Sequence, residues 1–151
     1  MENKFFTRKN PRLTNYNYTD GGYYFITICT KDKIHYFGEI LNEKMQFSEI
    51  GKIAQNSIKR IEEIYETIKI DKFVVMPNHI HIIIIIEKET SVSISRVIKQ
   101  YKEYITKQIK ETIWQKSFYD HIIRNEKDYL RIWEYIDENI LKWSLDKYYD
   151  L

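Results

Sequence analysis

Cysteine and long apolar runs are scarce in this sequence. Cys29 is the only cysteine among the 151 residues, which excludes an internal disulfide and a cysteine-based zinc site. No apolar run approaches the roughly 20 residues that cross a bilayer, and the first residues lack the apolar centre of a signal peptide. We therefore expect a protein without a membrane segment, located in the cytoplasm.

The sequence also lacks repeats, linkers and low-complexity segments, and its length fits a single domain over 1–151. Residues 1–20 are polar and basic and indicate an N-terminal arm. The net charge is only +2, but positive residues gather in that arm and in residues 96–110. Such clusters suit a polyanion, although a solvated helix face explains them equally well. The candidate DNA-binding residues are Arg8, Lys9, Arg12, Arg96, Lys99 and Lys102.

Hydrophobic periodicity predicts a mixed α+β fold. Strands are expected over residues 23–30, 67–76 and 79–86 and at the end of 114–123, with a short strand over 44–47 that pairs with the first. Helices are expected over 48–66, from Ser93 or Ser95 onward, and over 126–141, the last burying Tyr129, Trp133, Ile136 and Ile140. This order indicates a ferredoxin-like antiparallel sheet with two helices on one face and a C-terminal helix on the other.

Two histidines provide the sharpest local pattern. His79 and His81 follow Pro77-Asn78 at the start of a predicted strand, so their side chains point to the same face. Two imidazoles at this spacing can share one metal ion, and zinc, copper, iron or nickel would all suit them. The alternative is a hydrogen-bonded or solvated histidine pair without a metal. Because Ile80 and Ile82 point to the opposite face, the histidines should face away from the first two helices.

The C-terminal helix offers further groups for such a site. Tyr135 and Asn139 are four residues apart and lie on one helical face, at the margin of the buried stripe. We expect this face to approach the histidines, although a tyrosine that only packs at the edge of the core is the alternative. Asp120 and His121 are interpreted as a structural hydrogen-bond pair, with a contribution to the site as the alternative. The rival tyrosines by residue type are Tyr101, Tyr104, Tyr119 and Tyr129.

Four ordered blocks resemble the single-tyrosine HUH transposases, in particular their REP-associated tyrosine transposase branch. The blocks are YYFITICT at 23–30 with FGEI at 37–40, FVVMPNHIH at 73–81, WQ and FYDHIIRNE within 114–126, and EYIDEN at 134–139 followed by Lys142, Trp143 and Asp146. They cover nearly the whole chain in order.

The resemblance implies an activity and a set of residue roles. It implies a DNA endonuclease and strand transferase with a ferredoxin-like fold, in which Tyr135 attacks phosphorus and forms a 5′-phosphotyrosine. It implies Mg²⁺ or Mn²⁺ held by His79 and His81, with Asn139 completing the metal site. It implies single-stranded DNA beside a hairpin as the partner, association with the nucleoid, and a monomer or homodimer. The alternatives are a domesticated relative that processes host repeats and a non-catalytic ferredoxin-like module that binds nucleic acid.

Overall fold

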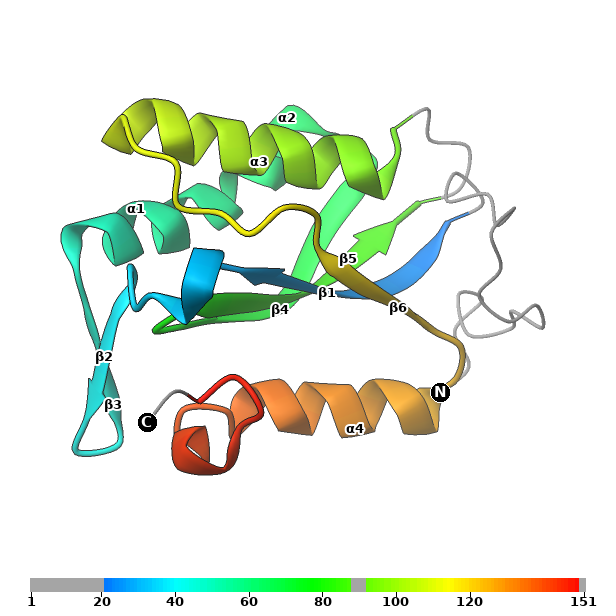
Figure 1. Ribbon diagram of the computed structural model, residues 1–151. Helices are drawn as coiled ribbons and strands as arrows, with labels where there is room; N and C mark the ends of the chain where they lie inside the picture. Colours follow the sequence, from blue (N-terminus) through cyan, green and yellow to red (C-terminus); the bar gives the residue numbers. More distant parts are fainter. Residues whose placement is uncertain (1–20, 88–91, 150–151) are drawn as a thin grey trace.

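A four-stranded antiparallel sheet lies between two layers of helices in the computed structural model, which describes residues 21–87 and 92–149 (Figure 1). The strands are β1 (Gly22–Cys29), β4 (Ile68–Met76), β5 (His79–Ile86) and β6 (Tyr119–Ile123), in the order β4-β5-β1-β6. Strand β5 lies between β1 and β4 and is antiparallel to both. This is the split βαβ arrangement of a ferredoxin-like fold, so the expected fold class is confirmed.

Helices in the described part of the chain cover both faces of the sheet (Figure 1). Helices α1 (Glu49–Ile58), α2 (Arg60–Ile64) and α3 (Ile94–Ile109) lie above the sheet, whereas α4 (Glu126–Asp137) lies below it. Ser48 and Ser93 cap α1 and α3 by accepting from the backbone N–H three residues on. Within the described ranges, no helix combines the length and the apolarity needed to span a bilayer.

The isoleucine run of β5 fills both faces of the sheet. Ile80, Ile82, Ile84 and Ile86 belong to the main core beneath α1 to α3. Ile83 belongs to a smaller core on the other face, where it packs with Ile132 and Ile136 of α4. The predicted burial of this strand on both faces is therefore confirmed, and the small core holds α4 against the sheet.

Several expected details are wrong. Residues Lys44–Phe47 form β3, which pairs with β2 (Gly38–Leu41) in a separate hairpin and not with the first strand. The helix expected over 48–66 is two helices, α1 and α2. Helix α4 ends at Asp137, because Glu138 already leaves helical geometry.

The buried face of α4 is also shifted from the expected one. Ile132 and Ile136 are buried, whereas Trp133 is 38% exposed and packs over the Lys72 ammonium group. Tyr129 is only half-buried, and Ile140 lies beyond the helix. Helical spacing allows either Ile132 or Trp133 to lie on the same face as Ile136, and only contact with the sheet decides which of the two is buried.

Candidate active site

His79 and His81 lie side by side on β5, on the face of the sheet that α4 covers. Both are almost fully buried, and their ring centroids are 4.6 Å apart. Ile80 and Ile82 between and beyond them point into the main core on the opposite face. The predicted orientation of the pair is therefore confirmed, and the solvated alternative is wrong for both rings.

The Nδ1 atom of each ring is held by a neighbouring side chain. Asn78 donates through Nδ2 to the Tyr148 carbonyl at 2.9 Å, so its Oδ1 faces His79 Nδ1 at 2.8 Å and accepts from it. His81 Nδ1 lies 2.8 Å from the Thr27 hydroxyl. Among the described residues, neither buried Nε2 atom has a hydrogen-bond partner. Outer hydrogen bonds of this kind orient metal-binding imidazoles and leave Nε2 available as the ligand atom.

Burial also keeps both imidazoles neutral. Desolvation lowers the pKa of His79 to about 4, while Asp146 and the neighbouring Asn139 side chain oppose this change. Desolvation and the neighbouring His79 hold the pKa of His81 well below its usual range. A neutral imidazole is the form that binds metal ions.

Without metal, these histidines should make the protein less stable as the pH falls. The unfolded chain takes up a proton on His79 near pH 6.5, whereas the folded chain does so only near pH 4. The free energy of unfolding should therefore drop between pH 7 and pH 5, by about 2 kcal/mol from His79 alone. Urea denaturation in EDTA at the two pH values measures this drop. His79→Gln should reduce this drop. An unchanged stability of the parent protein between the two pH values would contradict the burial of a neutral His79.

Asp146 offers a third candidate ligand atom that was not predicted as one. One ligand atom from each of His79, His81 and Asp146 lies within 4.8 Å of the other two. Asp146 follows the short helix η4 (Trp143–Leu145), in the segment that returns from the end of α4 to the sheet. The residues fit a divalent metal, because a ligand atom from each of two imidazoles and a carboxylate lie close enough to share one ion. The sequence feature that could have identified Asp146 as a ligand is its place in the last of the four blocks that resemble the transposase family.

Tyr135 and Asn139 reach the same point from α4 and from the turn after it. The Tyr135 hydroxyl donates to Asp146 Oδ2 at 3.2 Å, and Asn139 Nδ2 donates to the same oxygen at 2.7 Å. The Tyr135 ring lies 5.2 Å from the His81 ring, between centroids. Tyr135 is 37% exposed, whereas Asn139 is buried and its Oδ1 has no hydrogen-bond partner among the described residues. A single chain thus brings the tyrosine to the histidine pair.

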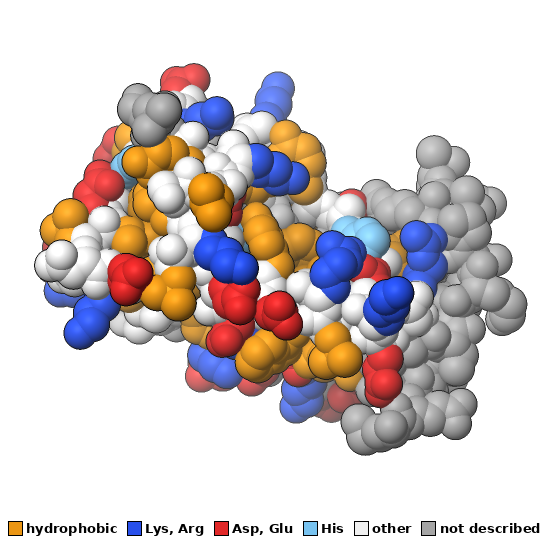
Figure 2. All heavy atoms as spheres, turned by 90° about the horizontal axis from the view of Figure 1, so that it is seen from below, with side chains coloured by type: hydrophobic (Ala, Val, Ile, Leu, Met, Phe, Trp, Pro, Cys, Tyr) orange, Lys and Arg blue, Asp and Glu red, His pale blue; other side chains and the backbone are white. Residues whose placement is uncertain are grey.

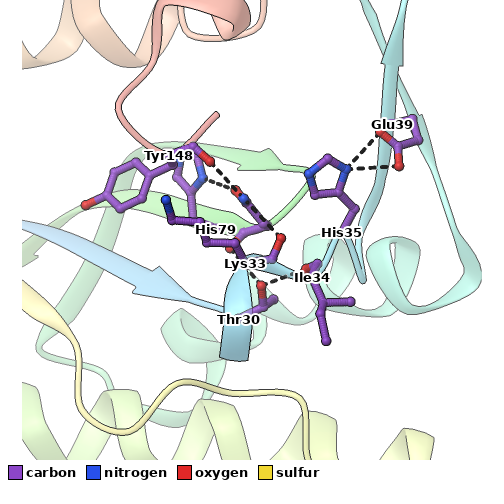
Figure 3. A network of polar contacts seen from close by, with 8 residues as sticks. Thr30, Lys33, Ile34, His35, Glu39, His79 and Tyr148 are labelled. Carbon is purple, nitrogen blue, oxygen red and sulfur yellow. Dashed lines mark hydrogen bonds and ion pairs between the residues drawn. The ribbon is translucent and has the colours of Figure 1, made fainter. Parts of the chain in front are cut away.

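The C-terminal segment closes one side of this cluster. The Tyr148 ring lies against the His79 ring, with centroids 4.3 Å apart (Figure 3).

Burial and the Asp146 carboxylate raise the pKa of Tyr135 to about 12. The phenol is therefore protonated at neutral pH, with its hydrogen directed to Asp146.

The rival tyrosines have other positions. The Tyr101 hydroxyl is buried and donates to the Ala54 carbonyl, and Tyr104 packs against Arg60 on the face covered by α1 to α3. Tyr129 donates to Asp71 at 2.6 Å. Tyr119 lies on β6, opposite Thr27 of β1, and is exposed. Tyr135, by contrast with these four residues, contacts both His81 and Asp146.

His121 pairs with a different acid from the one expected. Its Nε2 lies 2.7 Å from Asp128 of α4, so the expected Asp120–His121 hydrogen-bond pair is replaced by a bond between β6 and α4. Arg131 donates to the other Asp128 oxygen. These bonds hold the His121 ring against α4 through its Nε2 atom.

Three of the candidate DNA-binding residues are described by the structure, and these lie away from the histidines. Arg96 and Lys99 are exposed on α3, on the opposite face of the sheet (Figure 1). Lys102 is half-buried, and its ammonium group donates to the carbonyls of Gln115 and Ser117. Arg8, Lys9 and Arg12 lie outside the described residues.

Comparison with known proteins gives both sequence and fold relatives. No family model matches the chain. An uncharacterized protein of Haemophilus influenzae is 37% identical, over 94% of this chain and 93% of its own length. A second protein of that organism, provisionally named a REP-associated tyrosine transposase, is 26% identical over 86% of this chain and 77% of its own.

Two solved structures share the fold. A REP-associated tyrosine transposase bound to a REP hairpin superposes with a TM-score of 0.68 at 24% identity, over 90% of this chain and 76% of that one. A structure described as a provisional transposase from Deinococcus radiodurans gives a TM-score of 0.53 at 14% identity, over 87% of this chain and 97% of the other.

Proposed function

We propose a function from one premise: this chain belongs to the same family as the 37% identical Haemophilus influenzae protein and has the fold of the REP-associated tyrosine transposases. It cuts and rejoins single-stranded DNA, with Tyr135 as the nucleophile and a divalent metal held by His79, His81 and Asp146. The observation that carries this proposal is the convergence of a tyrosine hydroxyl and three metal-ligand side chains at one point.

The arrangement suits phosphoryl transfer. The Tyr135 oxygen gives up its proton and attacks phosphorus, the bond from phosphorus to the 3′ oxygen breaks, and a 5′-phosphotyrosine forms. The 3′ oxygen takes up a proton in exchange and leaves as a 3′ hydroxyl. The covalent link conserves the phosphodiester energy, so a second 3′ hydroxyl can reverse the step without ATP. Asp146 orients the phenol before attack, through the bond to its hydroxyl. A bound Mg²⁺ or Mn²⁺ would supply charge stabilisation for the phosphoryl oxygens, which prefer hard cations.

Asn139 is proposed as a supporting residue of this site. Its amide nitrogen already donates to Asp146, so it holds the carboxylate beside the histidines. Its buried Oδ1 has no hydrogen-bond partner in the part of the chain that the structure describes. An amide is a weaker ligand than a carboxylate, which favours Asp146 as the third ligand and Asn139 as the residue that positions it.

The proposed substrate is single-stranded DNA next to a hairpin, since one solved relative is described as bound to a REP hairpin. The direct test is to incubate the protein with a labelled hairpin oligonucleotide carrying single-stranded flanks and Mn²⁺. A labelled band that migrates with the protein on a denaturing gel is the expected result. A shift on a native gel without a covalent band would support a binding module instead.

The exposed cations of α3 are proposed to contact hairpin phosphates. Lys99→Ala should flatten the dependence of log K on log salt by about one unit if one phosphate contact is lost. Lys44→Ala, in the β2–β3 hairpin, is the control with the same charge change. Lys102→Ala should instead lower stability, because its ammonium group holds the 115–117 carbonyls. Equal slopes for Lys99→Ala and the parent, measured by filter binding, would remove α3 from the interface.

A further inference from the structure

Two surface hollows meet beside the candidate nucleophile, on the side of the sheet that carries α4. The first, of about 340 Å³, is lined by His81, Tyr135 and Asp146. The second, of about 480 Å³, is lined by Lys33, Tyr119 and His121. They share a common wall formed by Phe25, Thr27, Lys147 and Tyr148. A DNA strand bound at Tyr135 can therefore continue directly into the second hollow.

The floor of the second hollow is built by register between β1 and β6. Tyr119 lies opposite Thr27, and His121 lies opposite Phe25, so the four side chains are neighbours on one face of the sheet. Thr27 is also opposite His81 on β5, which puts Tyr119 two strands from the histidine, about 10 Å at ordinary strand spacing. The second hollow is thus one short step from the proposed reaction centre.

The side chains in this hollow suit an unpaired base. Tyr119 is 56% exposed although it is a large aromatic residue, and Phe25 is half-buried beside it. His121 also lines the hollow, and Asp128 of α4 holds its Nε2 at 2.7 Å. Aromatic faces of this kind stack on bases without regard to sequence.

Charge on the rim suits the phosphates that would join the two hollows. Lys147 belongs to the shared wall and is exposed, and Lys33 borders the second hollow. Asp120 is the acidic residue that borders the second hollow. The surface seen from below mixes basic, acidic and hydrophobic side chains (Figure 2). Lys147 therefore lies where a phosphate between a bound base and the Tyr135 site would pass.

We propose that the hollow at Tyr119, Phe25 and His121 binds an unpaired base of the nucleotide next to the cut, by stacking on Tyr119. The proposal rests on the function proposed above, and it names the part of the DNA that the site holds. The stacked base fixes the scissile phosphate in front of Tyr135, so Tyr119 acts as a positioning residue.

An abasic scan tests this arrangement. Hairpin substrates that each lack one base near the cut are compared in the parent protein, Tyr119→Ala and Tyr119→Phe, with the rate of covalent adduct formation as the readout. Loss of one particular base should slow the parent by about 10-fold, and Tyr119→Ala should slow the intact substrate equally. The two changes together should cost no more than either alone, while Tyr119→Phe keeps the parent rate because its ring still stacks. Fully additive losses would overturn the proposal, as would a Tyr119→Ala protein as fast as the parent.

A binding measurement separates this proposal from the proposed function. Fluorescence anisotropy of a labelled oligothymidylate is measured with Tyr135→Phe and with Tyr135→Phe/Tyr119→Ala, so that no cleavage is needed. The second protein should bind about 10-fold more weakly. Equal affinities would overturn the base site even where the parent forms adducts. The expected loss of affinity without any adduct in the parent would instead contradict the proposed chemistry alone.

Discussion

Tyr135→Phe is expected to abolish the covalent protein–DNA adduct while leaving the fold and DNA binding intact. The substitution removes only a hydroxyl, whose protein partner is Asp146 Oδ2. The ring keeps its edge contact with Phe25 and its packing beside His81. Loss of a nucleophile commonly costs on the order of 10³-fold or more in rate. Adduct formation on a denaturing gel and the thermal unfolding midpoint measure the two halves of this expectation.

Tyr129→Phe is the matched control for that experiment. Tyr129 lies on the same helix, and its hydroxyl also donates to a carboxylate, that of Asp71. Its removal should cost a little stability and leave adduct formation near the parent rate. If Tyr135→Phe still forms the adduct, the nucleophile is another residue, and Tyr119 and Tyr148 are the next tyrosines to replace because they line the adjoining hollows.

Loss of the metal ligands should have an effect of comparable size. His79→Ala, His81→Ala and Asp146→Ala should each reduce cleavage by on the order of 10²-fold or more, since a site with few protein ligands depends on each one. EDTA should abolish the activity of the parent, and Mg²⁺ or Mn²⁺ should restore it. Full activity in EDTA would exclude a metal from the mechanism.

Direct metal binding distinguishes Asp146 from Asn139. Mn²⁺ binding, followed by electron paramagnetic resonance, should be lost in Asp146→Ala and only weakened in Asn139→Ala. The reason is that Asp146 contributes a charged ligand atom to the cluster, whereas Asn139 contributes a hydrogen bond to that carboxylate. The opposite order would make Asn139 the third ligand, as the resemblance to the transposase family implied.

The sequence by itself determined the four strands of the main sheet, the direction of the histidines and the existence of a C-terminal helix. Strand alternation is a local property with a period of two, so His79 and His81 had to share a face once Ile80 and Ile82 were assigned to the core. The alternating and apolar pattern of residues 67–86 likewise required two adjacent strands, and Pro77-Asn78 required the turn between them. These features depend on neighbours within a few residues, and local patterns carry that information.

Only the tertiary structure decided that Asp146 joins the groups that meet at the histidines. Asp146 comes after the end of α4, in a segment whose path depends on how Asn139, Trp143 and Tyr148 pack beneath the sheet. The same holds for the second hollow, where the pairing of β6 with β1 sets Tyr119 beside Thr27, although 91 residues separate them in the sequence. Contacts between segments this far apart depend on the packing of the whole core, because no local pattern fixes the distance between two surfaces that touch only after folding.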